Sequence, residues 1–376
     1  MAIDKVVSAS ITDSSVTSAK VASGVLQPNF RNIVINGSMD ISQRATSASS
    51  LTGSGYNTVD RFQTSLTTLG TWTQSQSTTV PSGQGFASSL KMDCTTADAS
   101  PASGDNLKIR TKFEGQNLQY LKKGTSSAES LTLSFWVRSN KTGTYIVELM
   151  DNDNSQRHIN KSYTISSADT WEKKEITFAG DTTGALDNDD GAALEMSFYL
   201  GAGSGLTSGT LQTSWGAYEA TNRAVGQVNL ADSTDNEWYI TGIQLEVGTA
   251  ASDFEFLPRD VNLRRCLRYY EELGVASFAQ ANDSSSYWIS FNFRERKRAN
   301  PSASLLTTSI SIAGWGVFTR TTTSATIAAS YLTNTDAVYV RVGGFSGNTA
   351  GETGTPFQAF AESNGLKPFV AFSSEL

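Results

Sequence analysis

The chain has 376 residues with a formal net charge of −7 at pH 7, so it lacks the basic surface that tracking nucleic-acid phosphates requires. Aromatic residues make up 10% of the sequence, which excludes a disordered chain. Glycine is frequent at 31 residues, proline scarce at 7, and serine and threonine occur throughout. This composition predicts an all-β protein of many short strands, long enough for two or three domains.

Cysteine usage and the start of the sequence indicate the compartment. Cys94 and Cys266 are far apart and form no CxxC pattern, so we expect free thiols in a reducing cytoplasm and no disulfide scaffold. The opening residues contain no apolar signal-peptide core, and no stretch approaches the ~20 apolar residues of a membrane span. We therefore expect neither secretion nor membrane insertion.

Residues 1–31 carry a five-residue repeat, which fits neither the period of a helix nor that of a strand. Three interpretations stay open: a small β-solenoid, an extended chain wrapped around copies of itself or along a partner, and a disordered Ser/Thr-rich tail. We favour association, because five medium-sized side chains cannot form a core alone. The repeating apolar residues are Val6, Ile11, Val16, Val21 and Leu26.

Residues 32–257 are expected to form a β-sandwich of the jelly-roll type. Residues 32–46 suggest a strand, a turn at "NGS" and a second strand. Runs of alternating apolar and polar residues follow. They are separated by loops rich in Gly, Ser, Asp and Asn, with no helical stretch between them. The clearest run, residues 131–139, predicts a buried face formed by Leu131, Leu133, Phe135 and Val137.

The pattern changes at residues 258–272, where Pro258 and Asp260 offer a helix start and apolar residues recur at helical spacing. We interpret this segment as a short helical connector. Residues 273–376 return to strand-like runs and predict a smaller β-rich tip domain. The fold class is thus all-β: an extended N-terminal segment, a β-sandwich and a β-rich tip.

Five segments together resemble phage tail-fibre and related virion proteins that carry a carbohydrate-binding-module-like jelly roll. In chain order they are "NIVINGSMDISQR" (32–44), "VDRF" (59–62), "LTLSFWVRSNKTGTY" (131–145), "ITGIQLEVG" (240–248) and "CLRYYEE" (266–272). The resemblance covers roughly residues 29–272.

The resemblance implies a homotrimeric virion appendage that contacts the host surface, and it leaves open attachment to the tail or to the head. We expect a tail appendage that is made in the host cytoplasm. Residues 1–31 would anchor it to other virion proteins or trimerise it. Three copies of the repeat could bury their apolar rows against one another. Host-surface polysaccharide is the implied partner, with recognition in residues 273–376.

The sequence offers little for catalysis. His158 is the single histidine and lies in the polar stretch "NDNSQRHIN", so we expect a solvated loop residue rather than a member of a catalytic triad. One histidine and two distant cysteines cannot complete a zinc site. The carboxylates near Glu148 and those between Asp187 and Glu195 are interpreted as solvated loops. We expect no enzyme activity.

Two acidic loops could bind a structural calcium ion, because calcium prefers oxygen ligands. They are "DNDN" (151–154) and "DNDDG" (187–191), and neither has the spacing of an EF-hand. Hydrated turns are the alternative. The candidate ligands are Asp151, Asp153, Asp187 and Asp189.

Sugars stack on aromatic rings and bond to polar side chains around them, which points to aromatics in turn-rich stretches. Packing between domains or subunits is the alternative use of such residues. The glycan-binding candidates are Trp215 and Tyr218 in "TSWGAYEATN", then Trp315, Phe318, Arg320 and Tyr331 in the C-terminal region.

The sequence therefore predicts a non-enzymatic tail-fibre protein that attaches to host glycans. A structural virion protein without a sugar site, such as a head-decoration fibre or a tail adaptor, is the alternative. A cellular carbohydrate-binding module and a depolymerase are weaker alternatives, since the sequence shows neither a secretion signal nor the repetitive coils of a β-helix.

Overall fold

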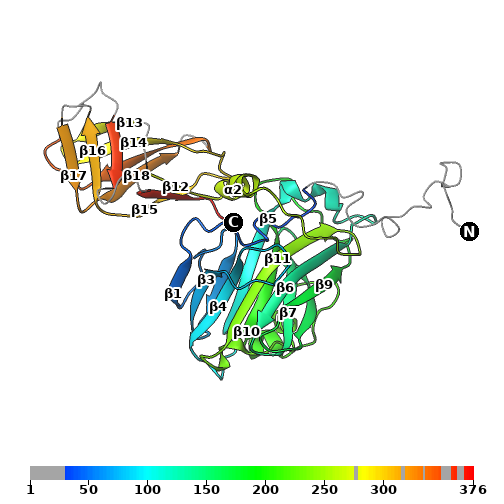
Figure 1. The fold of residues 1–376 in the computed structure, drawn as a ribbon. Helices are drawn as coiled ribbons and strands as arrows, with labels where there is room; N and C mark the ends of the chain where they lie inside the picture. The colour runs from blue at the N-terminus through cyan, green and yellow to red at the C-terminus, as the bar shows by residue number, and fades with distance from the viewer. Residues whose placement is uncertain (1–29, 275–277, 315–317, 333–334, 349–356, 362–367) are drawn as a thin grey trace, which may run out of the picture.

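The computed structural model describes residues 30–274, 278–314, 318–332, 335–348, 357–361 and 368–376. Among the residues named above, the five repeat positions Val6 to Leu26 and Trp315 lie outside the described residues. The described residues form a large β-sandwich and a smaller β domain, with helix α2 (Arg259–Leu267) between them (Figure 1). The all-β sandwich predicted from the sequence is confirmed.

Two antiparallel sheets make the sandwich. The six-stranded sheet runs in the order β1 (Ser47–Leu51), β3 (Thr71–Ser77), β4 (Ser89–Thr96), β11 (Glu237–Val247), β6 (Leu131–Ser139) and β9 (Glu172–Phe178). The five-stranded sheet runs in the order β2 (Gln63–Thr67), β5 (Asn106–Glu114), β10 (Ala192–Ala202), β7 (Gly143–Asp151) and β8 (Arg157–Ile165).

The connections between these strands carry short helices. They are η3 (Gly115–Asn117), η4 (Gln119–Leu121), α1 (Ser204–Thr207), η5 (Ala220–Asn222) and η6 (Leu230–Asp232). Of the helices in the described parts of the chain, none is long and apolar enough to cross a membrane.

Alternating apolar residues of both sheets fill the sandwich. The predicted face of β6 is buried, and Phe135 packs edge-on against Tyr163 and Phe198 of the opposite sheet, with ring centroids 5.0 and 5.1 Å away. Trp72 and Trp238 are fully buried in the same core. Because each large apolar side chain contributes about 1.5–3 kcal/mol on burial, this interior supplies most of the driving force for folding.

The strands predicted within residues 32–46 are wrong, because this segment is an irregular loop. The side chain of Asn32 donates to the carbonyl oxygen of Ile243 at 3.0 Å. Asn36, in a left-handed conformation with φ of 63°, both donates to and accepts from the backbone of Ile41, at 2.9 and 3.0 Å. Asparagine side chains thus provide the hydrogen bonds that a partner strand would otherwise supply.

The described residues of the C-terminal domain form three small sheets. One has the order β12 (Tyr270–Leu273), β21 (Val370–Ser373) and β15 (Ser302–Leu305). The second has the order β13 (Phe278–Asp283), β14 (Ser286–Asn292), β19 (Ala337–Gly343) and β18 (Thr326–Leu332). The third has the order β17 (Phe318–Thr322), β16 (Ile310–Gly314) and β20 (Phe357–Ala361).

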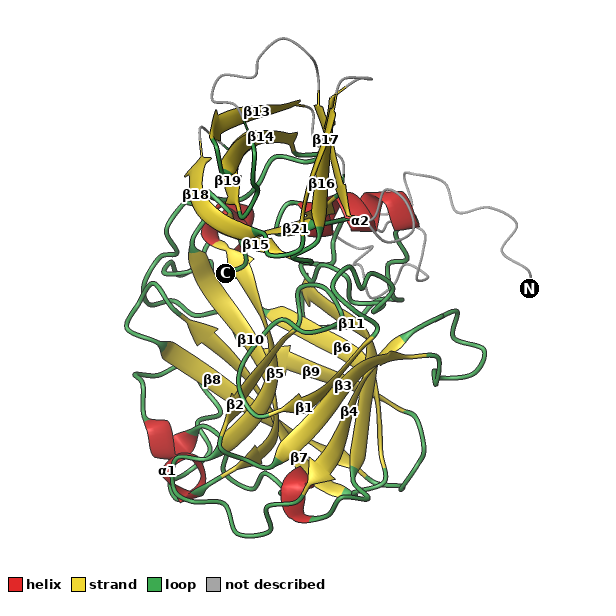
Figure 2. Ribbon diagram, turned by 90° about the vertical axis from the view of Figure 1, so that its left-hand side faces the viewer, coloured by secondary structure: helices red, strands yellow, loops and turns green. Residues whose placement is uncertain are grey.

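Helix α2 is shorter than the connector interpreted from the sequence. It ends at Leu267, and pairing with β21 places Tyr270–Leu273 in strand β12. In Figure 2 the C-terminal domain lies at one end of the sandwich and helix α1 at the other.

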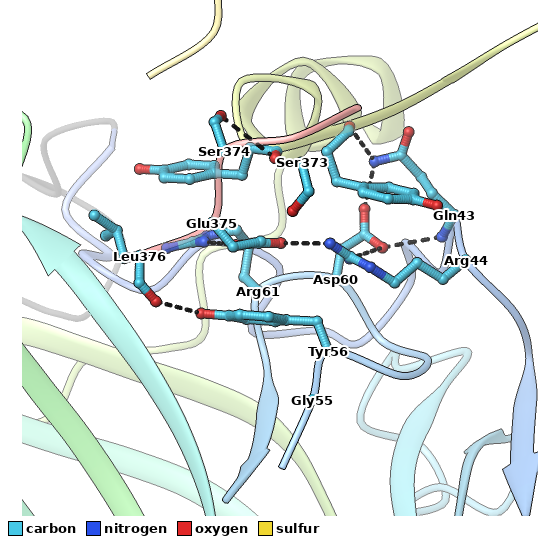
Figure 3. Close-up of polar contacts among 12 residues, drawn as sticks. Gln43, Arg44, Gly55, Tyr56, Asp60, Arg61, Ser373, Ser374, Glu375 and Leu376 are labelled. Carbon is cyan, nitrogen blue, oxygen red and sulfur yellow. Dashed lines mark hydrogen bonds and ion pairs between the residues drawn. The ribbon is translucent and has the colours of Figure 1, made fainter. Parts of the chain in front are cut away.

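Charged side chains join the two domains near the C-terminal residues (Figure 3). The carboxylate of Glu375 is held by the guanidinium groups of Arg61 and Arg44, the latter at 3.1 Å. Each arginine also lies over a tyrosine ring beyond α2, with Arg61 Cζ 3.4 Å from the centroid of Tyr269 and Arg44 Cζ 3.6 Å from that of Tyr270. We call these five residues the domain clamp.

A second carboxylate supports the domain clamp. Glu114 at the end of β5 accepts hydrogen bonds from Arg268 Nε and Nη2 at 2.8 and 2.7 Å, and from the hydroxyl of Tyr269. Burial alone would raise the pKa of Glu114, but these bonds more than offset it and hold the pKa below its ordinary value. The two domains therefore meet through paired charges.

Replacing Glu375 with Gln should destabilise the protein by about 3–5 kcal/mol, because it leaves the buried guanidinium of Arg61 without its counter-charge. Denaturant unfolding followed by tryptophan fluorescence measures this. The matched control is Glu295→Gln, whose exposed pair with Arg264 should contribute at most about 1 kcal/mol. Equal effects of the two variants would contradict the structural role of the domain clamp.

Candidate functional site

The outer face of the five-stranded sheet carries polar and charged residues, opposite to the apolar face that packs in the sandwich. On β5, Lys108 and Arg110 alternate with the core residues Leu107 and Ile109. The neighbouring strands β10, β7 and β8 bring further polar side chains to this face through their registers with β5 and with one another. These side chains are Glu195, Ser197, Tyr199, Glu148, His158 and Asn160.

Residues 203–229, which we call the cover segment, lie against this face. The backbone of Gly216 bridges to His158 at the free edge of β8, and Asn160 N donates to the carbonyl of Gln212 at 2.7 Å. Farther along, Ala224 is fully buried in a small apolar cluster that includes Tyr199 of β10. The outer face is therefore partly roofed by the chain itself.

An ion pair fastens the cover segment to the sheet. Glu148 of β7 is fully buried, and Arg223 donates to both of its carboxylate oxygens, from Nε at 2.7 Å and from Nη2 at 2.6 Å. Burial by itself would raise the pKa of Glu148, but Arg223 overcomes this and holds the pKa below the ordinary value. The bidentate geometry fixes the guanidinium in one orientation.

A second buried carboxylate lies beside the first. Glu195 of β10 is 3.1 Å from Lys108 Nζ and 3.1 Å from Arg110 Nη1. Burial opposes ionisation, yet the two cations lower the pKa of Glu195 to about 2. Lys108 also lies 4.0 Å from Glu148, so it stands between the two carboxylates.

The sequence-based expectation that His158 is a solvated loop residue is wrong. His158 is fully buried on β8. Its Nε2 accepts from the backbone N–H of Glu219 at 3.3 Å, so the ring proton is on Nδ1, which lies 2.9 Å from Asn160 Oδ1. The histidine is therefore neutral in this arrangement and helps to hold the cover segment.

A pocket of 290 Å³ opens between the cover segment, the start of β5 and the loop before it. Tyr218 on its wall is 42% exposed, and its hydroxyl accepts from Arg223 Nη1 at 3.4 Å. Tyr199 is buried at the wall and donates its hydroxyl proton to Glu148 at 3.3 Å. The lining residues are Ser103, Gly104, Asn106, Lys108, Tyr199, Gly205, Leu206, Tyr218 and Arg223.

The structure separates the two glycan-binding candidates of the cover segment. Tyr218 lines the pocket, whereas Trp215 does not. Trp215 packs against the main core, and its indole Nε1 donates to the carbonyl of Ala179 at 2.8 Å. This contact lies within the sandwich and not between domains or subunits, and the part of Trp215 in sugar binding stays a prediction.

The C-terminal candidates stand on different sheets. Phe318 and Arg320 are on β17, and Arg320 is half-buried, whereas Tyr331 is on β18 of another sheet. Trp315 lies outside the described residues. Their proposed part in sugar binding stays a prediction.

A lysine joins the first of the two acidic loops that were considered for calcium to residues 181–184. Lys123 Nζ contacts the buried carboxylate of Asp151 and lies 3.1 Å from Asp181 Oδ2. It also donates to the carbonyl oxygens of Thr183 and Gly184, at 3.0 and 2.8 Å. Its ammonium group therefore occupies an oxygen-lined position of the kind that calcium takes in proteins.

The other candidate ligands bond to the backbone. Asp153 accepts from the N–H of Asp187 at 2.9 Å, and Asp189 accepts from the N–H of Gly191 at 2.8 Å. Among the residues that the structure describes, no group of three or more His, Cys, Asp and Glu side chains could hold a metal ion. Lys123 and backbone N–H groups thus satisfy carboxylates that the sequence offered to calcium.

Solved structures with similar folds include a phage protein and carbohydrate-binding modules. The enzymatically active domain of tailspike protein 4 of bacteriophage CBA120 is 12% identical over 58% of this chain, with a TM-score of 0.31, and the match spans 22% of that tailspike chain. A carbohydrate-binding module solved with β-1,4-galactotriose is 8% identical over 58% of this chain and 99% of its own, with a TM-score of 0.29.

A further match is the family 11 carbohydrate-binding module of a cellulosomal cellulase of Clostridium thermocellum. It is 12% identical over 54% of this chain and 99% of its own, with a TM-score of 0.26. No protein-family model and no curated protein matches the chain. Function therefore has to be inferred from this chain's own residues.

The buried carboxylate of Glu195 makes stability depend on pH. Its folded pKa of about 2 lies below the ordinary 4.5, so its contribution is complete above pH 4.5 and is lost as the pH falls towards 2. We expect Glu195→Gln to cost about 3 kcal/mol at pH 7, with the difference from wild type vanishing near pH 2. Urea unfolding across this range measures it.

The control for this prediction is Glu129→Gln, which removes an exposed carboxylate paired with Lys122. This variant should differ from wild type by no more than about 1 kcal/mol at any pH. A Glu195→Gln deficit that persists undiminished at low pH would show that lost packing, and not lost charge pairing, is responsible.

Proposed function

We propose that the chain is a non-enzymatic virion appendage protein that binds saccharide on the host surface, with its sandwich pocket as a contact site. The observation that carries the proposal is the composition of the pocket wall. A half-exposed tyrosine ring stands beside the donors of Lys108, Arg223 and Asn106. Sugar recognition uses this combination of an aromatic face and fixed polar groups.

The pocket is preorganised for a polar ligand. Arg223 is fixed by its two bonds to Glu148, and the Tyr218 hydroxyl is in turn bonded to Arg223. A ligand would therefore meet side chains that have already lost their rotamer freedom, which reduces the entropy cost of binding. The volume of 290 Å³ suits a single sugar ring or its substituent better than a long chain.

The charge state of the two buried carboxylates argues against glycoside hydrolysis. That reaction requires one carboxyl group that is protonated near neutral pH and one that is ionised. Glu148 and Glu195 both have a lowered pKa, so neither can serve as the acid. Both also lie behind the residues that line the pocket. Binding without cleavage is the proposed role.

The virion setting is supported by the five sequence segments that resemble tail-fibre proteins, which span roughly residues 29–272. On this proposal the chain acts as a homotrimer, residues 1–31 attach it to other virion proteins or trimerise it, and host polysaccharide is the partner. Three weak sites on one appendage gain strength through avidity.

A structural virion protein without a sugar site is the second candidate function. The cover segment favours it, because Arg223 and Ala224 close much of the outer face that would otherwise form an open groove. On this alternative the charged residues of the outer face serve only to hold the cover segment.

Glycan-array binding by the full chain separates the two candidates. We expect Tyr218→Ala to weaken binding by roughly fivefold, in line with about 1 kcal/mol for a lost aromatic contact. Tyr120→Ala is the matched control, because Tyr120 is also exposed but lies outside the pocket. Wild-type protein that binds no glycan, while its unfolding remains cooperative, would favour the structural alternative.

Light scattering tests the assembly. We expect the full chain to have the mass of three 40.3 kDa chains. If residues 1–31 trimerise it, their removal gives monomers; if they only anchor it, the truncated chain remains a trimer. A monomeric full chain would contradict the trimeric appendage.

A further inference from the structure

We propose that the sandwich pocket selects an acidic saccharide, one whose carboxylate or sulfate group binds at Lys108 and Arg223. The proposal deepens the saccharide-binding function proposed above and rests on it. It is carried by the distribution of charge between the wall of the pocket and the residues behind that wall.

The pocket wall has cations and no acid. Lys108 and Arg223 line it, and none of its other lining residues carries a charge. The acids next to lining residues in sequence are engaged elsewhere: Asp105 accepts from Ala102 N at 2.7 Å, and Glu219 accepts from the hydroxyl of Thr221 at 2.8 Å. A ligand entering the pocket therefore meets positive charge.

The positive charges in and beside the pocket wall outnumber the carboxylates that pair with them. Three cations, Lys108, Arg110 and Arg223, surround two carboxylates, Glu148 and Glu195. Arg223 pairs with the first carboxylate and Arg110 with the second, which leaves the charge of Lys108 in excess. His158 adds no charge, because its Nε2 accepts a backbone hydrogen bond.

Lys108 is placed to give its remaining donors to a ligand. Its side chain is only 7% exposed and donates a hydrogen bond to Glu195 at 3.1 Å, whereas an ammonium group has three donors. A buried charged group normally has hydrogen-bond partners for all of its donors, because its removal from water costs free energy. An anionic group in the pocket would complete this set and neutralise the excess charge.

The test uses matched pairs of oligosaccharides with the full chain. The acidic members are a hyaluronan hexasaccharide, a galacturonate tetrasaccharide, 3′-sialyllactose and sulfated lactose. The neutral members are the carboxyl-reduced forms of the first three, and lactose for the fourth. We expect at least one acidic member to bind at least tenfold more tightly than its neutral partner. The carboxylated and sulfated arms identify which anionic group is bound.

Two variants locate the effect. Lys108→Met should weaken binding of the preferred acidic member at least tenfold, and by a larger factor than it weakens any binding of the neutral partner. Lys112→Met removes a half-buried cation two positions beyond Arg110 on the same strand, but outside the pocket wall, and should change affinity less than twofold. This control separates pocket contact from general attraction.

The outcomes distinguish this inference from the function on which it rests. Neutral members that bind as tightly as acidic ones would overturn acidic selectivity and leave saccharide binding standing. Equal losses in Lys108→Met and Lys112→Met would overturn the placement at Lys108. A panel on which no member binds would overturn both proposals together. The comparison of acidic and neutral ligands with the wild-type chain needs no variant, so it tests acidic selectivity even if Lys108→Met does not fold.

Discussion

The ion pair between Arg223 and Glu148 is the interaction on which the outer face of the sandwich depends. Glu148 is fully buried, and a buried carboxylate without a counter-charge would cost several kcal/mol. Since Arg223 belongs to the cover segment, the requirement to neutralise Glu148 also holds that segment on the sheet. The same pair closes most of the outer face, fixes Tyr218 through Arg223 Nη1, and leaves the pocket at its margin.

The contact between the domains, at the other end of the sandwich, also depends on carboxylates that are paired with arginines. Glu375 and Glu114 are each held by arginine, and the tyrosines that follow helix α2 lie against the guanidinium groups or donate to the carboxylate. Paired charges of this kind are directional, so they specify one docking geometry where an apolar contact would permit several. Helix α1, whose Gly205 and Leu206 line the pocket, lies at the end of the sandwich opposite to the C-terminal domain (Figure 2).

Alternation in the sequence was enough to predict the sandwich, because strands with one buried face repeat apolar residues with a period of two. Residues 131–139 show this, since the predicted face is the buried face of β6. The strands predicted within residues 32–46 are absent, although a run of three β-branched residues, Ile33 to Ile35, is typical of a strand. There the side chain of Asn32 donates to the backbone of Ile243 and that of Asn36 to the backbone of Asp60, which no local pattern reveals.

The site was harder to predict because charged residues were assumed to face water. Glu148, Glu195 and His158 were assigned to solvated loops, yet each is buried beside partners that come from other strands. One usable signal was present: Lys108, Arg110 and Lys112 recur at every second position of β5 among apolar neighbours, which marks a charged sheet face. Arg223, which pairs with Glu148, lies 75 residues farther along the chain, so its role required the fold.

The size and the rigidity of the pocket together constrain how such a protein could adhere. A pocket of 290 Å³ buries little ligand surface, so a single site gains little binding energy however well its donors are placed. Strong attachment then requires several sites to engage one surface at once, and linked sites can raise overall affinity by about 10²–10⁴ when their geometry permits. The cover segment fixes the pocket residues, and the domain clamp fixes the sandwich relative to the C-terminal domain. In the proposed trimer, three pockets held in fixed orientations would lose little entropy on binding a repetitive polysaccharide. Under that condition, a small site is sufficient for strong attachment.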